Sequence, residues 1–286
     1  MPPASTQELV DAANDKGGGV AAFNAITLEH GEAIVAGAEQ AQLPVIIGVS
    51  HNAVRYHEHR LAPLARALLT LAQQASVPVA VHLDHIEDWD LLGQAPELGI
   101  SSAMFDASQL PYDDNVEATR EAADWAHRHG MWLEAELGEV GGKDGVHSPT
   151  ARTDPSEAKH FVHRTGVDAL AVAVGTSHAM TSQTAHVDLE LVTRLHDALP
   201  VPLVLHGSSG LSDERLQRTA RAGIRKINIG TQLNIALTSK VRTTLAEDTT
   251  LVDPRKYLRP GRDAMAAAVA HLLSLTVNGS SSPSSL

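Results

Sequence analysis

The strongest constraint on the fold is a regular alternation of short apolar runs with longer segments that have helical spacing. Eight of the apolar runs have the length and the Val, Ile and Leu content of buried β-strands. Several of the segments between them end in Gly or Pro, as helices do. Strands that alternate with helices form a parallel sheet. The predicted strands are residues 20–25, 45–49, 77–83, 103–105, 131–137, 169–174, 203–206 and 226–229.

Eight strand–helix units in a chain of 286 residues predict one closed barrel. A (β/α)8 TIM barrel needs about 250 residues. The alternative, a doubly wound open sheet, is disfavoured because no GxGxxG turn follows the first run. We therefore expect an α/β fold, a single-domain (β/α)8 TIM barrel over residues 1–275. Residues 276–286 are Ser-rich and have too few apolar side chains to fold, which predicts a flexible, low-complexity tail.

Composition and charge disfavour several classes of function. The formal net charge is −12, whereas nucleic acids and anionic membranes are bound by clustered Lys and Arg. The first residues do not resemble a signal peptide, and no apolar run has the length of a membrane span. We therefore expect a cytoplasmic protein without a nucleic-acid or membrane partner. There is no cysteine, so a metal site would use His and carboxylate side chains.

Polar side chains recur where the predicted strands end. In chain order they are Asp84, His85, Asp106, Glu134, Glu136, His178, His206, Asn228 and Thr231. Barrels of this class carry their active sites at the carboxyl ends of the strands. We therefore expect these side chains to meet at one mouth of the barrel.

Three histidines in this set predict a metal site. His85, His178 and His206 follow three different strands, and a catalytic Zn²⁺ keeps three protein ligands and an exchangeable position. Glu136 is the candidate fourth ligand. A single strand-end histidine among the 16 in the chain is more often structural, but three at one mouth weaken that interpretation. We expect His82, two residues before Asp84, to be a packed core residue or a support for its neighbours.

Asp84 and His85 are adjacent, although side chains alternate between the two faces of a regular strand. Both can face the same mouth only if the strand ends or bends at this point. We expect such an irregularity here.

Two loops have the composition of a phosphate site. "HGSSG" at residues 206–210 and "NIGT" at 228–231 each run from a strand end towards a predicted helix, the first beginning near Ser212. Small residues allow backbone N–H groups at a helix start to face an anion, and barrels often bind phosphate after strands seven and eight. Each loop by itself also fits an ordinary turn.

A set of motifs resembles one known family. In order, "AFN", "HLDH", "EAELG", "GVDALAVAVGTSH", "LHGSSG", "KINIGT" and "DPRKYLRPGRDAM" resemble the class II, metal-dependent fructose- and tagatose-bisphosphate aldolases. The resemblance covers about residues 7–275. It implies a TIM barrel that reversibly cleaves a ketose bisphosphate to dihydroxyacetone phosphate and an aldehyde phosphate.

The resemblance implies roles for individual side chains. His85, His178 and His206 match the family's zinc ligands, and Glu136 matches a glutamate that joins them when the metal shifts. Asp84 matches the catalytic acid/base, which would take the proton from the C4 hydroxyl during cleavage.

Two loops depart from the family pattern. Asp144 aligns by count with the family's proton-transferring glutamate, with an ordinary turn residue as the alternative. The sequence reads His178-Ala179 where the family commonly has His-Gly, and the usual aromatic and basic residues are missing after it. Ser182 is the remaining candidate to donate to a phosphate there. The resemblance also implies a monovalent cation near that phosphate site.

The remaining matches concern the substrate and the assembly. Arg259 matches an arginine that reaches the distal phosphate from a neighbouring subunit, which implies a homodimer or homotetramer. The matches to residues that contact the substrate are Ser50, Gly207, Ser209, Asn228, Gly230 and Thr231.

Fructose 1,6-bisphosphate is the expected substrate, and the products would be dihydroxyacetone phosphate and glyceraldehyde 3-phosphate. "LHGSSG" favours the fructose branch of the family, whereas Ser182 in place of a lysine favours the tagatose branch. Tagatose 1,6-bisphosphate and a deoxy-keto acid phosphate are the alternatives with the same chemistry. A metal-dependent barrel hydrolase and a non-catalytic phosphosugar-binding barrel are the alternatives from other classes.

Overall fold

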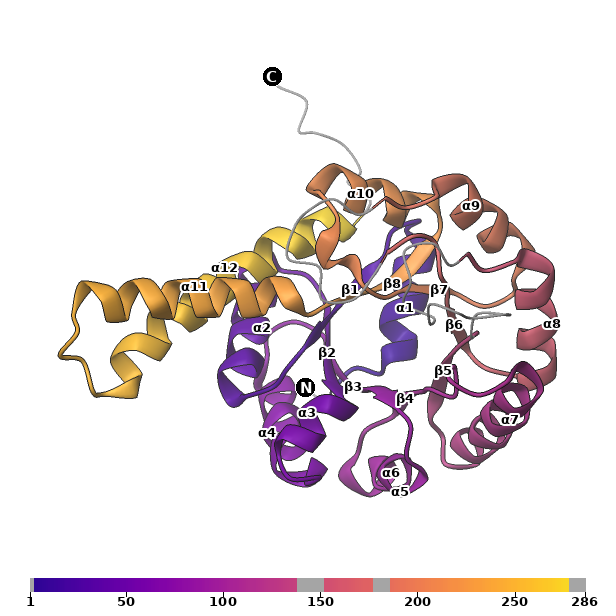
Figure 1. Ribbon diagram of the computed structural model, residues 1–286, viewed down its shortest axis with the longest axis horizontal. Helices are drawn as coiled ribbons and strands as arrows, with labels where there is room; N and C mark the ends of the chain where they lie inside the picture. Colours follow the sequence, from indigo (N-terminus) through magenta and orange to yellow (C-terminus); the bar gives the residue numbers. More distant parts are fainter. Residues whose placement is uncertain (1–2, 138–151, 177–185, 278–286) are drawn as a thin grey trace.

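The computed structural model describes residues 3–137, 152–176 and 186–277 and contains a closed barrel of eight parallel strands in sequential order (Figure 1). β1 pairs with β8, with Ala22 opposite Asn228, which closes the sheet on itself. The strands are β1 Val20–Asn24, β2 Val45–Ser50, β3 Val79–Ile86, β4 Ser102–Phe105, β5 Trp132–Glu136, β6 Ala169–Ala171, β7 Leu203–Leu205 and β8 Ile224–Ile229. The predicted α/β fold, a (β/α)8 TIM barrel, is confirmed.

Helices surround the barrel (Figure 1). They are α1 Thr6–Asp15, α2 Leu28–Ala41, α3 His51–Tyr56, α4 Leu61–Gln74, α5 Trp89–Gly93, α6 Ala95–Leu98, α7 Tyr112–Arg128, α8 Pro155–Thr165, α9 Leu189–Ala198, α10 Asp213–Ala222, α11 Thr231–Glu247 and α12 Pro254–Thr276. Among the described residues, no helix is both long and apolar enough to span a membrane. The final helix α12 ends at Thr276, and residues 278–286 of the predicted tail lie outside the described part of the chain.

Strand alternation divides the buried side chains into two cores. On β5, Leu133 and Ala135 belong to the outer core between the sheet and the helices, whereas Trp132 belongs to a smaller core inside the barrel. Glu134 lies on the same inward face as Trp132, because side chains two apart share a face. The inner face therefore carries both apolar and charged groups.

Helix α1 covers the amino-terminal end of the barrel. Ser5 accepts a hydrogen bond from the backbone of Glu8, and Glu8 accepts one from the backbone of Ser5, so a capping box starts the helix. Leu9 and Val10 of α1 belong to the apolar cluster inside the barrel. Because α1 closes this end, the opposite mouth is the one that can admit a ligand.

Strand β3 bends at the predicted place. His85 has a φ of 51°, in the left-handed region that non-glycine residues rarely adopt, and the pairing of β3 with β4 shifts register between Leu83 and Ile86. The strand nevertheless continues to Ile86, so it bends rather than ends. This bend interrupts the alternation and brings Asp84 and His85 to one side.

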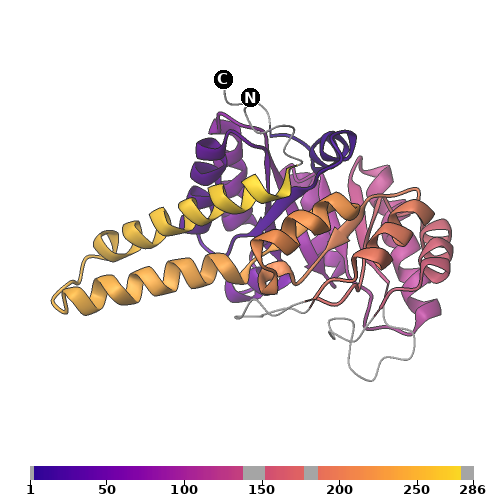
Figure 2. The same cartoon turned by 90° about the horizontal axis from the view of Figure 1, so that it is seen from above.

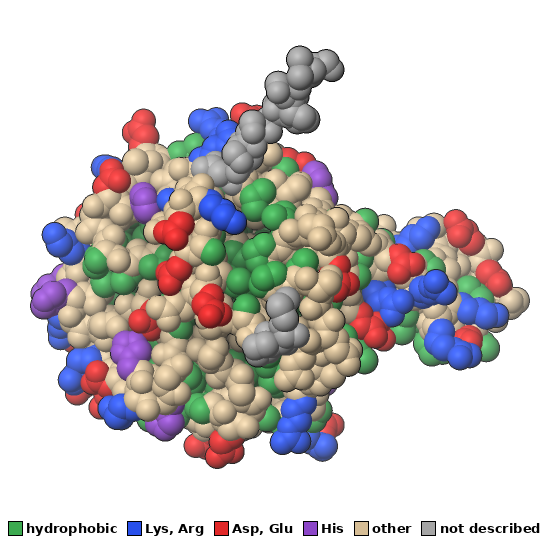
Figure 3. Space-filling model, turned by 180° about the vertical axis from the view of Figure 1, so that it is seen from behind, with side chains coloured by type: hydrophobic (Ala, Val, Ile, Leu, Met, Phe, Trp, Pro, Cys, Tyr) green, Lys and Arg blue, Asp and Glu red, His purple; other side chains and the backbone are tan. Residues whose placement is uncertain are grey.

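Helices α11 and α12 form an antiparallel hairpin that projects away from the barrel (Figures 1 and 2). Their inner parts remain anchored, since Leu233 of α11 and Met265 of α12 are fully buried. Viewed from behind, Lys and Arg side chains lie on the projecting part (Figure 3). Arg255, Lys256 and Arg259 of α12 are exposed there. The projecting part of the hairpin therefore presents basic side chains at a distance from the barrel.

Candidate active site

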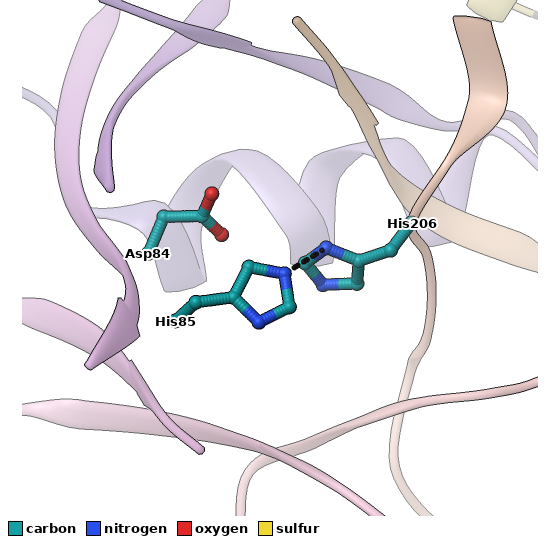
Figure 4. Close-up of side chains that lie close together, drawn as sticks. All are labelled: Asp84, His85 and His206. Atoms are coloured by element: carbon teal, nitrogen blue, oxygen red, sulfur yellow. Dashed lines mark hydrogen bonds between the residues drawn. The ribbon is translucent and has the colours of Figure 1, made fainter. Parts of the chain in front are cut away.

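Two histidines and an aspartate converge at the open mouth of the barrel (Figure 4). Asp84 and His85 come from β3 and His206 follows β7, and their ligand-type atoms all lie within 4.8 Å of one another. Nε2 of His85 and Nδ1 of His206 are 3.0 Å apart. Asp84 and His206 are buried, whereas His85 is only partly buried. The fold thus brings together side chains that are far apart in sequence.

A carboxylate fixes each imidazole ring on the side away from this meeting point. Nδ1 of His85 donates to Oδ2 of Asp106 at 2.6 Å, and Nε2 of His206 donates to Oε1 of Glu134 at 2.9 Å. Because an ionised carboxylate only accepts, each of these nitrogens carries a proton, so the nitrogen that can coordinate a cation is the facing one on each ring. Two imidazole nitrogens beside a carboxylate are a donor set that fits Zn²⁺.

Neighbouring charges shift the pKa values of both histidines. Burial opposes protonation of His85, but the charge of Asp84 and the hydrogen bond to Asp106 outweigh it and raise its pKa to about 10. Burial, followed by the charge of His85, lowers the pKa of His206. At neutral pH the pair therefore holds one proton between its facing nitrogens, and a metal cation competes with that proton.

Glu136 extends the site on the far side of His85. Its carboxylate, His85 and Asp106 form a second group whose ligand-type atoms lie within 4.8 Å of one another. Burial, reinforced by the charge of Asp106, raises the pKa of Glu136 to about 8. A nearby cation reverses such a shift, because it favours the ionised carboxylate. Glu136 is thus a metal-ligand candidate on the same side of the barrel as His85.

Asp84 is held in place through both of its oxygens. Nδ2 of Asn24 donates to Oδ2 at 2.6 Å, and Nδ2 of Asn228 donates to Oδ1 at 2.9 Å. Burial alone would raise the pKa of Asp84, but the charges of His85 and His206 outweigh it and keep the pKa well below its usual range. Asp84 is therefore an oriented, ionised carboxylate that can accept a proton.

A cavity opens beside Asp84, His85 and His206. Among the groups at its wall, Oδ1 of Asn228 has no hydrogen-bond partner within the described residues. A buried acceptor of this kind can receive a hydrogen bond from a ligand hydroxyl. Six of the predicted substrate-contact residues line this cavity: Ser50, Gly207, Ser209, Asn228, Gly230 and Thr231.

The two predicted phosphate loops border the cavity. Gly207 has a φ of 67°, which favours glycine, and it leads into the 3₁₀ turn η1, Ser208–Gly210. The helix predicted near Ser212 begins at Asp213. Gly230 precedes α11, and the first residue of that helix, Thr231, lines the cavity. The positive end of a helix therefore lies at the cavity, where it favours an anion.

Arg259, the other predicted substrate contact within the described residues, does not line this cavity. Arg259 lines a separate surface pocket on the projecting hairpin, which it shares with Glu29 and Glu32 of α2. Three predicted site residues lie outside the described part of the chain: Asp144, His178 and Ser182.

Sequence reasoning missed three side chains of the site: Asn24 contacts Asp84, Asp106 contacts His85, and Lys226 contacts Glu134 behind His206. Asn24 belongs to the motif "AFN" and Asp106 to the strand-end set, but no individual role was predicted for either of them or for Lys226. Lys226 lies two residues before Asn228 and Asn24 two residues after Ala22, on the inward faces of β8 and β1. The period-two pattern of each strand was the signal that could have identified Asn24 and Lys226.

Comparison with known proteins identifies the family. The sequence profile described as class-II fructose-bisphosphate aldolase matches residues 4–281. The chain belongs to the class II fructose-bisphosphate aldolase family. Members of this family are carbon–carbon lyases that act on phosphosugars and are generally zinc-dependent, in agreement with the resemblance predicted from the motifs.

Individual relatives agree with this assignment over nearly their whole length. The chain is 38% identical to fructose-bisphosphate aldolase of Geobacillus stearothermophilus over 269 residues, or 93% of each chain. It is 37% identical to a probable fructose-bisphosphate aldolase of Bacillus subtilis (strain 168), covering 94% of this chain and 95% of the relative. The crystal structure of the YdjI aldolase from Escherichia coli K12 superposes with a TM-score of 0.81 at 33% identity, covering 96% of each chain. An aldolase is thus supported over the hydrolase and the non-catalytic barrel.

Proposed function

We propose that this protein is a zinc-dependent ketose-bisphosphate aldolase that reversibly cleaves fructose 1,6-bisphosphate to dihydroxyacetone phosphate and glyceraldehyde 3-phosphate. The observation that carries the proposal is the meeting of His85, His206 and Asp84 beside a cavity lined by both phosphate loops. Metal ligands, a proton acceptor and an anion site are the three elements that a metal-dependent aldol cleavage of a phosphosugar requires.

The zinc site in this proposal consists of His85, His206 and His178, with Glu136 as an additional ligand. The converging nitrogens of His85 and His206, each backed by a carboxylate, support it. A Zn²⁺ ion held by these residues would supply a Lewis acid for the negative charge that develops on the substrate when the C3–C4 bond breaks. Asp106 and Glu134 hold the two described imidazole rings in the orientation that binding needs.

Proton transfer is assigned to two aspartates. Asp84 takes the proton from the C4 hydroxyl during cleavage and returns it to the aldehyde during condensation. Asn24 and Asn228 support this role, because their amides fix both oxygens of the carboxylate and leave it ionised. Asp144, outside the described residues, is assigned the proton at the carbon of dihydroxyacetone phosphate that is deprotonated for condensation.

The phosphates are assigned to two places. The dihydroxyacetone phosphate end lies against the loops after β7 and β8, where Gly207, Ser209, Gly230 and Thr231 line the cavity. Ser182 donates to the same phosphate, with a monovalent cation nearby. The distal phosphate is bound by Arg259 of a neighbouring subunit in a homodimer or homotetramer.

An assay of triose phosphate release tests this proposal. Fructose 1,6-bisphosphate and tagatose 1,6-bisphosphate are compared at equal concentrations, because the two sugars differ only in the configuration at C4. We expect faster release from the fructose epimer, complete loss of activity with a chelator, and recovery when Zn²⁺ is added back. Faster release from the tagatose epimer would overturn the substrate assignment, and full activity in chelator would overturn the metal assignment.

Replacement of Arg259 by Ala is expected to raise KM for the bisphosphate by about tenfold or more while leaving zinc content unchanged. The variant loses a charge-assisted contact to phosphate, worth about 1.5–3 kcal/mol. Within the described residues, Arg255 pairs with Asp253 and Arg262 pairs with Glu32, whereas Arg259 forms no ion pair. Arg259 is therefore the guanidinium in this pocket that can receive a phosphate.

Arg255 provides the matched control for this experiment. It lines the same pocket and is exposed like Arg259, but it is already paired with Asp253. Arg255→Ala should leave KM within about twofold of the unmodified protein, because it removes an exposed ion pair worth little. Equal effects of the two substitutions, or full activity of a monomer in dilute solution, would contradict the shared site.

A further inference from the structure

A buried ion pair crosses the interior of the barrel below the candidate metal site. Nζ of Lys226 on β8 is 2.7 Å from Oε2 of Glu134 on β5, and both side chains have an exposed fraction of 0%. The two strands are not neighbours in the barrel, so the pair spans its interior. Lys226 does not line the cavity beside Asp84, which excludes it as a residue that touches the substrate.

The pair is connected directly to His206. Oε2 of Glu134 receives the lysine, while Oε1 accepts from Nε2 of His206 at 2.9 Å. Glu134 therefore uses one oxygen for the counter-charge and the other for the imidazole ring. The opposite nitrogen of that ring, Nδ1, is the one that lies 3.0 Å from Nε2 of His85.

On the side of Glu134 away from His206, the interactions continue through uncharged side chains. Nε2 of His82 is 3.8 Å from Oε2 of Glu134, and Nδ1 of His82 is 3.0 Å from Oγ of Ser102. Oγ of Ser102 is in turn 2.6 Å from Oγ1 of Thr6 in α1. Burial, followed by the charge of Lys226, lowers the pKa of His82 to about 3, so this ring is neutral at physiological pH. The lysine and the carboxylate are thus the charged members of this part of the network.

Stability does not account for such a pair. A buried ion pair loses the hydration of both charges, and apolar residues of similar volume are often equally or more stabilising. The arrangement instead places the counter-charge of Lys226 on one oxygen of Glu134 and leaves the other oxygen to accept from Nε2 of His206.

We propose that Glu134, held in place by Lys226, is a positioning residue that sets the orientation and tautomer of His206 so that Nδ1 binds the metal. This inference rests on the proposed metal site. Asp106 has the equivalent contact with His85, but it follows the carboxyl end of β4 and is only partly buried, whereas Glu134 is fully buried. Glu134 lies one inward position deeper than Glu136, where an unpaired carboxylate would be too costly to remain ionised.

Zinc affinity of the double variant Glu134→Gln/Lys226→Met tests the inference. The double substitution removes both buried charges together and keeps the side-chain volumes, so the barrel retains its packing. Metal-free full-length protein is titrated with Zn²⁺ against a coloured chelator of known affinity. Loss of a supporting contact to a metal ligand typically weakens metal binding by about 10–100-fold, and we expect this range for the double variant. Unchanged zinc affinity in a folded double variant would overturn the inference.

Ser102→Ala is the matched control. Ser102 is equally buried in the barrel interior but is separated from His206 by His82 and Glu134. Its loss should affect thermal unfolding and leave zinc affinity within about twofold, since it changes no contact of a ligand. An equal loss of zinc affinity in Ser102→Ala would show that any damage to the core weakens the site, and would overturn the specific role of Glu134.

A measurement on the unmodified protein does not depend on folding of a variant. Long-range ¹H–¹⁵N NMR spectra report which nitrogen of His206 carries the proton in metal-free and zinc-loaded protein. We expect the proton on Nε2 in both forms, and a proton on Nδ1 in the zinc-loaded form would overturn the inference. If the unmodified protein binds no Zn²⁺ at all, the proposed function fails, which is distinct from a double variant that binds as tightly as the unmodified protein.

Discussion

Replacement of Asp84 by Asn is expected to lower kcat for cleavage of the bisphosphate by about 10²–10⁴-fold, the range for loss of a general acid/base group. Asparagine has nearly the same shape but cannot take a proton from the C4 hydroxyl. Asp84 is suited to that task because Asn24 and Asn228 fix its two oxygens and because it remains ionised despite its burial. The rate of triose phosphate release at saturating substrate, normalised to bound zinc, measures the effect.

A second reaction separates this role from general damage to the site. Hydrogen exchange from dihydroxyacetone phosphate does not involve the C4 hydroxyl, so it should remain detectable in Asp84→Asn. Asp88→Asn makes the same chemical change four residues further along, at an exposed position that caps α5, and asparagine caps helices equally well. The control should keep full cleavage activity. Cleavage by Asp84→Asn within about tenfold of the unmodified protein would exclude Asp84 as the acid/base group.

Replacement of Lys226 by Met alone is expected to lower the free energy of unfolding of the metal-free protein by about 3–5 kcal/mol. The substitution leaves the carboxylate of Glu134 in the barrel interior without its counter-charge, although His206 still donates to it. Urea denaturation at neutral pH, followed by circular dichroism, measures the loss. This effect is as large as the removal of a large core side chain.

The paired substitution distinguishes charge from packing. Adding Glu134→Gln to Lys226→Met should restore most of the lost stability, because it removes the uncompensated charge and leaves the packing unchanged. Lys240→Met, at an exposed position of α11, should change the free energy of unfolding by no more than about 0.5 kcal/mol. If Lys226→Met alone costs less than about 1 kcal/mol, water reaches Glu134 and the pair is not buried in solution.

Local sequence patterns were sufficient to predict the barrel. All eight predicted runs overlap the observed strands, because a strand buried on both sides must be short, apolar and β-rich. Strand boundaries were predicted less well: β3 was predicted to end at Leu83 and extends to Ile86, whereas the run predicted over 169–174 forms a strand only over Ala169–Ala171. Adjacency of Asp84 and His85 also predicted an irregularity, since only a break in alternation can bring both to one side.

Contacts between strands could not be predicted in the same way. The alternation of side chains predicts which face of the sheet a residue occupies. It does not predict how far along the barrel axis the side chain lies or which residue faces it across the interior. Glu134 and Lys226 are 92 residues apart in sequence, and Asn228 and Asp84 are 144 apart. Residues so far apart in sequence come into contact because β1 pairs with β8 and closes the sheet.

The sequence by itself therefore determined the element order, the fold and the set of side chains at the strand ends, because these depend on local composition and period. Tertiary structure decided how the members of that set act on one another: which carboxylate backs each histidine, which amides hold Asp84, and where a lysine supplies the counter-charge to Glu134. Such interactions depend on the spacing and register of strands around a closed barrel, which no single strand encodes.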